Sequence, residues 1–130
     1  MFTPLRLPAA LAACLTAAVA TAGVDEADFS LGTTQNLYDL CAVTSDDENF
    51  APAIYACRSF LEATVQYHDA VSDGRTLKRL ICYPATATLE DARRAFIAWA
   101  EANAGNPKRM AELPVVGVVR ALQDKYPCAR

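Results

Sequence analysis

The stretch LCAVTSDDENFAPAIYACRSFLEATVQYHDAV, residues 40–71, decides the fold. One apolar helical pattern ends at Cys41 and is followed by a polar, acidic loop. The longest helical pattern of the chain begins at Pro52. Proline is favoured in the first turn of a helix, and the following core positions recur at three- and four-residue spacing. These positions are Ile54, Cys57, Leu61, Val65, His68 and Val71. The stretch predicts a helical hairpin whose second helix ends at Asp73-Gly74.

Three further helical patterns flank this stretch. The first is capped by Thr33-Thr34 and has an apolar side formed by Leu37, Leu40 and Cys41. Another opens at Thr88, with Asp91 completing a capping box, and ends at Gly105 and Pro107; its apolar side holds Leu89, Ala92, Phe96, Trp99 and Ala100. The last begins at Leu113-Pro114 and ends before Pro127, with a predicted inner face of Val115, Val118, Val119 and Leu122. Residues 75–87 read as a turn or a short extended segment, so we expect an all-α fold, a small disulfide-stapled bundle of about four helices.

The N-terminal residues 1–22 have the features of a signal peptide. Arg6 precedes an apolar run over residues 7–20, and Ala20-Thr21-Ala22 is an A-x-A cleavage site. Leu11-Ala12-Ala13-Cys14 also fits the lipoprotein consensus, but cleavage there would leave a very short apolar segment before the cysteine and an apolar tail after it. We therefore expect Cys14 to be removed, and residues 23–130 to form a single helical domain in the periplasm.

Four cysteines remain after this cleavage: Cys41, Cys57, Cys82 and Cys128. In a short exported domain they imply two disulfides, and spacing alone leaves three connectivities open. The order of the helices favours one of them. A helical hairpin brings Cys41 to Cys57 across the acidic loop, and two antiparallel helices return Cys128 to the level of Cys82.

The charge of the mature chain limits its partners. Without Arg6, eleven Lys and Arg face fifteen Asp and Glu, a net charge of −4 that is spread along the chain. This distribution disfavours nucleic acid and anionic membranes as partners, and mildly favours a basic protein.

No catalytic or metal-binding pattern stands out. The cysteines and His68 lack the short spacing of structural zinc sites, and His68 lies eleven residues from Cys57, about three helical turns away. The acidic pairs Asp46-Asp47 and Glu90-Asp91 fit a solvated loop and a helix first turn. We expect His68 to be a helix-flank or core residue, and the protein to have no enzymatic activity, metal or cofactor.

A family resemblance follows from the order of several motifs. They are Gly32, residues 37–41, Ala56-Cys57 opening a long helix, Cys82-Tyr83-Pro84 with Thr88-Leu89, Pro107, Ala121-Leu122 and the ending Tyr126-Pro127-Cys128. Over nearly the whole mature chain this order resembles the Rap/Tai family of type VI secretion immunity proteins. The resemblance implies a periplasmic, disulfide-bonded helical homodimer that binds a secreted peptidoglycan amidase effector and blocks its active-site cleft. Many members follow the second cysteine with a small residue, an aromatic, an aliphatic and a later glycine. This chain has Ser59 and Ala63 at the small positions, so the glycine is lost.

The partner-binding surface has no family motif in this chain, so its prediction rests on the residues. We expect it at Asp46, Asp47, Glu48, Asn49 and Phe50, an acidic loop with a terminal aromatic that suits a basic-rimmed cleft. A solvated connector is the simpler interpretation, and Arg75, Lys78 and Arg79 are a second candidate surface for an acidic partner. The alternative function is a periplasmic stress protein or holdase, or an envelope accessory protein; a neighbouring gene for a secreted amidase would favour immunity.

Overall fold

The computed structural model describes residues 23–72, 75 and 77–129. The proposed signal peptide, Cys14 and the helix stop at Asp73-Gly74 lie outside the described residues. The described part contains a 3-10 turn and five α-helices and no strand: η1 (Asp28–Ser30), α1 (Thr34–Ala42), α2 (Phe50–Val71), α3 (Leu89–Asn103), α4 (Pro107–Met110) and α5 (Pro114–Lys125). The all-α prediction is confirmed. The sequence patterns missed α4, because a single turn is too short to show helical periodicity.

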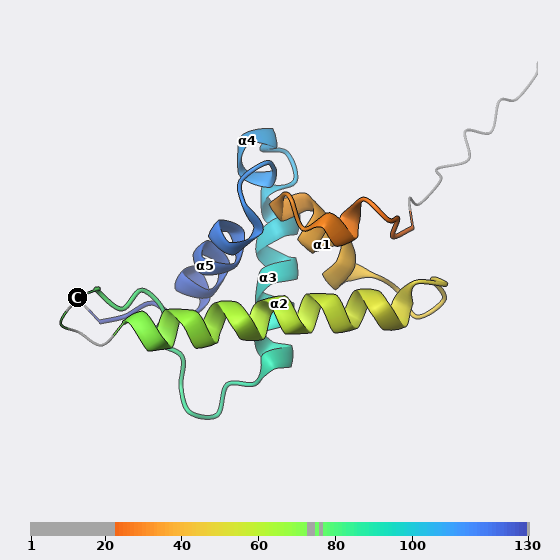
Figure 1. Cartoon of the computed structure of the whole chain (residues 1–130). Coiled ribbons are helices and arrows are strands. Elements are labelled where there is room, and N and C mark those ends of the chain that lie inside the picture. The colour runs from red at the N-terminus through yellow and green to blue at the C-terminus, as the bar shows by residue number, and fades with distance from the viewer. Residues whose placement is uncertain (1–22, 73–74, 76, 130) are drawn as a thin grey trace, which may run out of the picture.

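The helices are arranged around α2, which runs across the whole molecule (Figure 1). Helix α3 crosses it and also packs against α5 and α1, while α1 and α5 contact each other. Fully buried side chains from all of these helices form one core, with Leu37, Leu40, Leu61, Phe96 and Leu122 at its centre. The long helix turns Cys57, Leu61 and His68 inward, as its spacing predicts.

Local side-chain bonds fix where two of the helices begin. In α3, Thr88 accepts from the backbone N–H of Asp91, and the Asp91 carboxylate accepts in return from the Thr88 N–H, the predicted capping box. Hydrogen bonds from Thr88, and then from Arg94, lower the pKa of Asp91 from 3.8 to about 2. Helix α1 has the same arrangement with Thr33 and Asn36. Each box satisfies backbone donors that a helix N-terminus otherwise leaves unpaired.

Helices α1 and α5 meet at an unusually close contact. The Thr34 side chain is buried, and its hydroxyl and backbone N–H both donate to the carbonyl of Glu112, at 3.0 and 2.8 Å. A Cβ atom on Gly117 would lie 2.6 Å from Cγ2 of Thr34, so only glycine fits at this point of α5.

This contact corrects the predicted inner face of α5. Val118 and Leu122 are buried as expected, but Val115 is 38% exposed and Val119 is only half-buried. The buried face turns instead through Gly117 and Ala121, because small residues allow α5 to approach its neighbours.

The two disulfides join Cys41 to Cys57 and Cys82 to Cys128, the pairing that the helix order predicts. Their Cα atoms lie 5.1 and 4.9 Å apart, within the normal span of a disulfide. The first is fully buried, whereas Cys82 is exposed. Among the described residues no helix has the length and apolar character that crossing a membrane requires.

Candidate functional site

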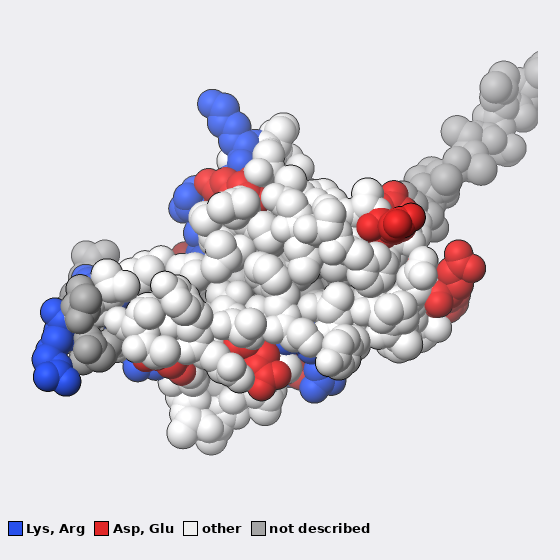
Figure 2. Space-filling view, viewed as in Figure 1, with Lys and Arg blue, Asp and Glu red and all other residues white. Residues whose placement is uncertain are grey.

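The acidic loop between α1 and α2 lies at the end of the molecule where α2 begins. Asp46 and Glu48 are exposed, and Figure 2 shows acidic side chains at this end of the molecule. A hydrogen bond from the Thr44 hydroxyl lowers the pKa of Asp46. The neighbouring leader adds exposed Asp25 and Glu26. This end of the molecule therefore presents several carboxylates to a partner.

The other members of the predicted loop surface are used by the fold itself. The Asp47 carboxylate accepts from the backbone N–H of Val24 at 3.0 Å and from that of Asn49 at 2.7 Å. The Asn49 amide in turn donates to the Val24 carbonyl at 3.0 Å, and Phe50 packs against the core. Asp47 and Asn49 thus tie the leader to the loop, which leaves Asp46 and Glu48 as the outward-facing pair.

A shallow hollow of about 660 Å³ separates the leader from α1 and the loop. It is lined by Tyr38 and Asp39 of α1 together with the loop carboxylates of Asp46 and Asp47. Burial, and then the nearby acids, raise the pKa of Asp39 above its usual value. The hollow is acidic, so a cation suits it better than an anion.

The second predicted surface lies at the opposite end of α2, where Figure 2 shows basic side chains. Arg75 and Lys78 are exposed. Arg79 is instead bound to the protein: it donates to Asp69 Oδ1 at 2.7 Å and to the Ile81 carbonyl at 3.1 Å, and its guanidinium lies 5.9 Å from the Tyr83 ring centroid. Because α2 has 22 residues, the acidic and basic ends are about 33 Å apart along its axis.

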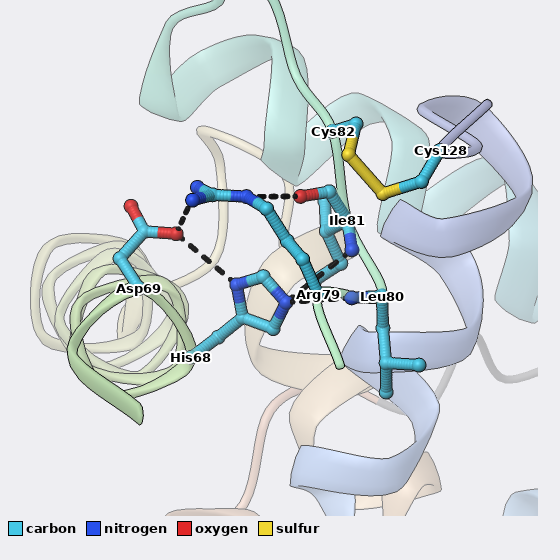
Figure 3. The surroundings of a disulfide bond; sticks show 7 residues. All are labelled: His68, Asp69, Arg79, Leu80, Ile81, Cys82 and Cys128. Carbon is cyan, nitrogen blue, oxygen red and sulfur yellow. Dashed lines mark hydrogen bonds and ion pairs between the residues drawn. A yellow bond between two sulfur atoms is a disulfide. The ribbon is translucent and has the colours of Figure 1, made fainter. Parts of the chain in front are cut away.

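His68 is a core residue, as the sequence predicts, and Figure 3 shows how it is used. Its Nε2 accepts from the backbone N–H groups of Leu80 and Ile81, at 3.2 and 3.3 Å, and its Nδ1 lies 3.1 Å from Asp69 Oδ1. These partners assign the ring as neutral, with its proton on Nδ1. His68 therefore holds residues 80–81 against α2.

Asp69 is the centre of this polar cluster. Burial would raise its pKa, but hydrogen bonds from Tyr83 and His68, with the charge of Arg79, outweigh burial and lower the pKa below its usual value. The hydrogen bond between Tyr83 and Asp69 raises the pKa of the Tyr83 hydroxyl. The ionised carboxylate joins α2 to the segment that carries Cys82.

None of this geometry assembles a nucleophile. All four described cysteine sulfurs are in disulfides, and the His68 nitrogens are occupied by backbone and Asp69. Within residues 23–72, 75 and 77–129, no three His, Cys, Asp or Glu side chains gather in a way that could hold a metal ion.

A groove of about 320 Å³ between α2 and the start of α3 was not anticipated from the sequence; we call it the α2–α3 groove. Its floor is apolar, formed by Val65, Leu89, Ala92 and Leu122. Along its rim lie Glu62, Gln66 and Asp69 from α2, and Tyr83 and Tyr126 from the disulfide-linked segments. The spacing of the three α2 residues could have indicated a shared polar flank, but nothing local showed that it faces an apolar floor.

Comparison with known protein families gives a match that covers most of the described chain. A family described as Rap1a immunity proteins matches residues 33–128, which include all five α-helices and both disulfides of the described chain. The searches of curated proteins and of solved structures gave no match.

Proposed function

The chain belongs to the family of Rap1a immunity proteins, and from this premise we propose that it neutralises a type VI secretion effector, a peptidoglycan amidase, in the periplasm. The family match over the whole helical domain is the observation that carries the proposal. An immunity protein acts by binding a partner protein, so no catalytic centre of its own is needed. We propose that it has no enzymatic activity.

The disulfides support the periplasmic assignment. Both link segments that are needed for the fold, and disulfides of this kind form and persist in oxidising compartments. Residues 1–22 are proposed to be the signal peptide that takes the chain there, and residues 23–130 to be the single mature domain. Purified from the envelope, the protein should begin at Gly23 by intact mass. A diacylated Cys14 in that measurement would contradict the proposal.

The acidic end of the molecule supports binding to a basic-rimmed cleft. Asp46 and Glu48 project from a loop whose two flanking helices, α1 and α2, are joined by the Cys41–Cys57 disulfide. A loop held in one conformation loses little entropy on binding. We propose that this loop contacts the amidase.

An exposed apolar face on α5 supports a homodimer. Leu113 is 62% exposed and Val115 38% exposed, and Val116 and Val119 line a shallow hollow beside them. A two-fold dimer would cover this face with its own copy. Val115→Glu should shift the sedimenting species toward the monomer, whereas Tyr55→Glu, on the exposed face of α2, should not.

Rescue of cells tests the proposed function. The proposal expects an amidase gene beside this one. Its product should be toxic in the periplasm, and co-expression of the full chain should restore growth, while a chain without residues 1–22 should not. The purified protein should bind the amidase tightly and leave peptidoglycan intact. Absence of binding would favour the stress-protein or holdase interpretation instead.

The loop requires a variant that spares the fold. Asp46→Lys with Glu48→Lys should weaken amidase binding by at least ~2 kcal/mol, roughly thirtyfold. Asp47 stays unchanged, because its carboxylate holds Val24. The matched control reverses Asp124 and Glu101, which are also exposed, and produces the same change in net charge. Equal affinities for the two double variants would remove the loop from the interface.

A further inference from the structure

We propose that the α2–α3 groove is a docking site for a basic side chain, a lysine or an arginine, that the partner protein presents. The inference rests on the proposed function, because it takes the partner to be the effector. It adds a second contact surface, apart from the acidic loop, and names the chemistry of what that surface binds.

The size and floor of the groove suit one long side chain. A volume of about 320 Å³ is at the lower end for ligand pockets, enough for one or two side chains. Val65, Leu89 and Leu122 line the floor, and Leu122 is 1% exposed, so the floor is firmly packed. The methylene groups of lysine or arginine can cover such a surface while the charged end stays at the rim.

The polar groups at the rim offer unpaired acceptor atoms, one of them on a carboxylate, which favours a cation. Gln66 Nε2 already donates to Glu62 Oε1 at 3.2 Å, and the Tyr83 hydroxyl donates to Asp69. In the described part of the chain, Glu62 Oε2 and the Gln66 amide oxygen accept no hydrogen bond. An ammonium or guanidinium group has several donors and no acceptor, the complement of this rim.

The charge balance points the same way. Asp69 is neutralised by Arg79, which lies 2.7 Å from its Oδ1. Glu62 forms no ion pair with any described residue, so its negative charge is uncompensated. The groove therefore keeps one negative charge at its rim for a partner cation.

The C-terminal disulfide holds the groove open in one shape. Tyr83 and Tyr126 stand close to Cys82 and Cys128 in the chain, and the Cys82 N–H donates to the Tyr126 carbonyl at 2.9 Å. The Tyr83 hydroxyl donates to Asp69, which links Tyr83 back to α2. Both aromatic walls are thus placed before any partner arrives, which lowers the entropic cost of binding.

A small probe tests the groove without any effector. The probe is lysine acetylated on its α-nitrogen and carrying a C-terminal N-methylamide, so its side-chain ammonium group is free. Titrated into the isotope-labelled mature protein, it should give saturable NMR shifts in the amides of residues 62–69 and 83–92. Acetyl-norleucine-N-methylamide, which has an apolar chain and no charge, should shift them less. Glu62→Gln should weaken the lysine probe about two- to fivefold. Equal shifts with norleucine, or no saturable shift at these residues, would overturn the proposal.

The effector tests whether the groove is used in the complex. Glu62→Gln should weaken binding of the co-encoded amidase about tenfold, because a charged hydrogen bond is lost from a desolvated contact. Asp124→Asn removes the same charge from an exposed position that lines neither the groove nor the acidic loop, and serves as the matched control for long-range attraction. Equal affinity of Glu62→Gln and wild type would overturn the docking role. If the wild type binds no amidase, the proposed function fails, while the probe titration still decides the groove.

Discussion

Replacing Cys82 and Cys128 together with serine should destabilise the protein by about 4 kcal/mol. The two residues are separated by 46 positions in the chain. In the chain-entropy model, a disulfide that closes a loop of that length restricts the unfolded chain. Removing it therefore lowers the free energy of unfolding by about 4.0 kcal/mol. For a ~100-residue domain this corresponds to a fall in Tm of about 19 °C. Serine adds little further cost here, because Cys82 is exposed and Cys128 is half-buried.

The corresponding change at Cys41 and Cys57 is the informative comparison. Their separation of 16 positions predicts an entropic loss of only about 3.1 kcal/mol. Both side chains are 0% exposed, however, so two serine hydroxyls would be buried, at about 1–3 kcal/mol each. The shorter loop should therefore give the larger destabilisation, against the order that loop length alone predicts.

Urea unfolding followed by circular dichroism measures both changes, with the wild type in parallel and a thiol assay to verify bonding. If the Cys82 and Cys128 double variant loses less than about 1 kcal/mol of unfolding free energy, the reasoning is refuted, because loop closure would then not explain how much this disulfide stabilises the protein. A larger loss for the Cys82 pair than for the Cys41 pair would show that burial of the hydroxyls is unimportant.

The remaining predictions concern single residues. Gly117→Ala should destabilise by about 1–3 kcal/mol, because its Cβ would lie 2.6 Å from Cγ2 of Thr34. Gly105→Ala, with no atom within 4 Å, should be neutral or stabilising in the same thermal melts. His68→Leu should cost about 1–3 kcal/mol and speed hydrogen exchange of the two backbone amides it binds, and unchanged exchange would mean that the ring does not hold them. The folded-state pKa of Asp91 lies below its ordinary 3.8, at about 2, so its contribution is present above pH 3.8 and lost as pH falls toward 2. Asp91→Asn should flatten the pH dependence of the urea midpoint in that window, and an unchanged slope would count against the capping box.

Much of the fold follows from local chemistry. Thr88 with Asp91 marks the start of α3, and the prolines at 52 and 114 mark first turns of α2 and α5, because capping and proline geometry act within a few residues. The disulfide pairing follows from the order of the helices along the chain. Helices joined by short connections lie antiparallel, so the order of the helices alone brings the right cysteines together.

The acidic loop was predictable in position and composition but not in the roles of its members. Asp46 and Asp47 are identical neighbours in the sequence, yet one faces solvent and the other binds the Val24 N–H. The difference arises from a leader 23 residues earlier in the chain, which local pattern does not connect to the loop.

The sequence by itself determined the four longer helices, the capping of α1 and α3 and the disulfide framework, because these depend on residues near one another or on helix order. Tertiary structure alone decided which face of α5 is buried, where Gly117 meets Thr34 and turns Val115 outward. It also created the α2–α3 groove, whose rim and floor come from residues 62–69, 83–92 and 122–126. Periodicity reports which side of a helix is apolar, but a groove exists only where distant segments come close without filling the space between them.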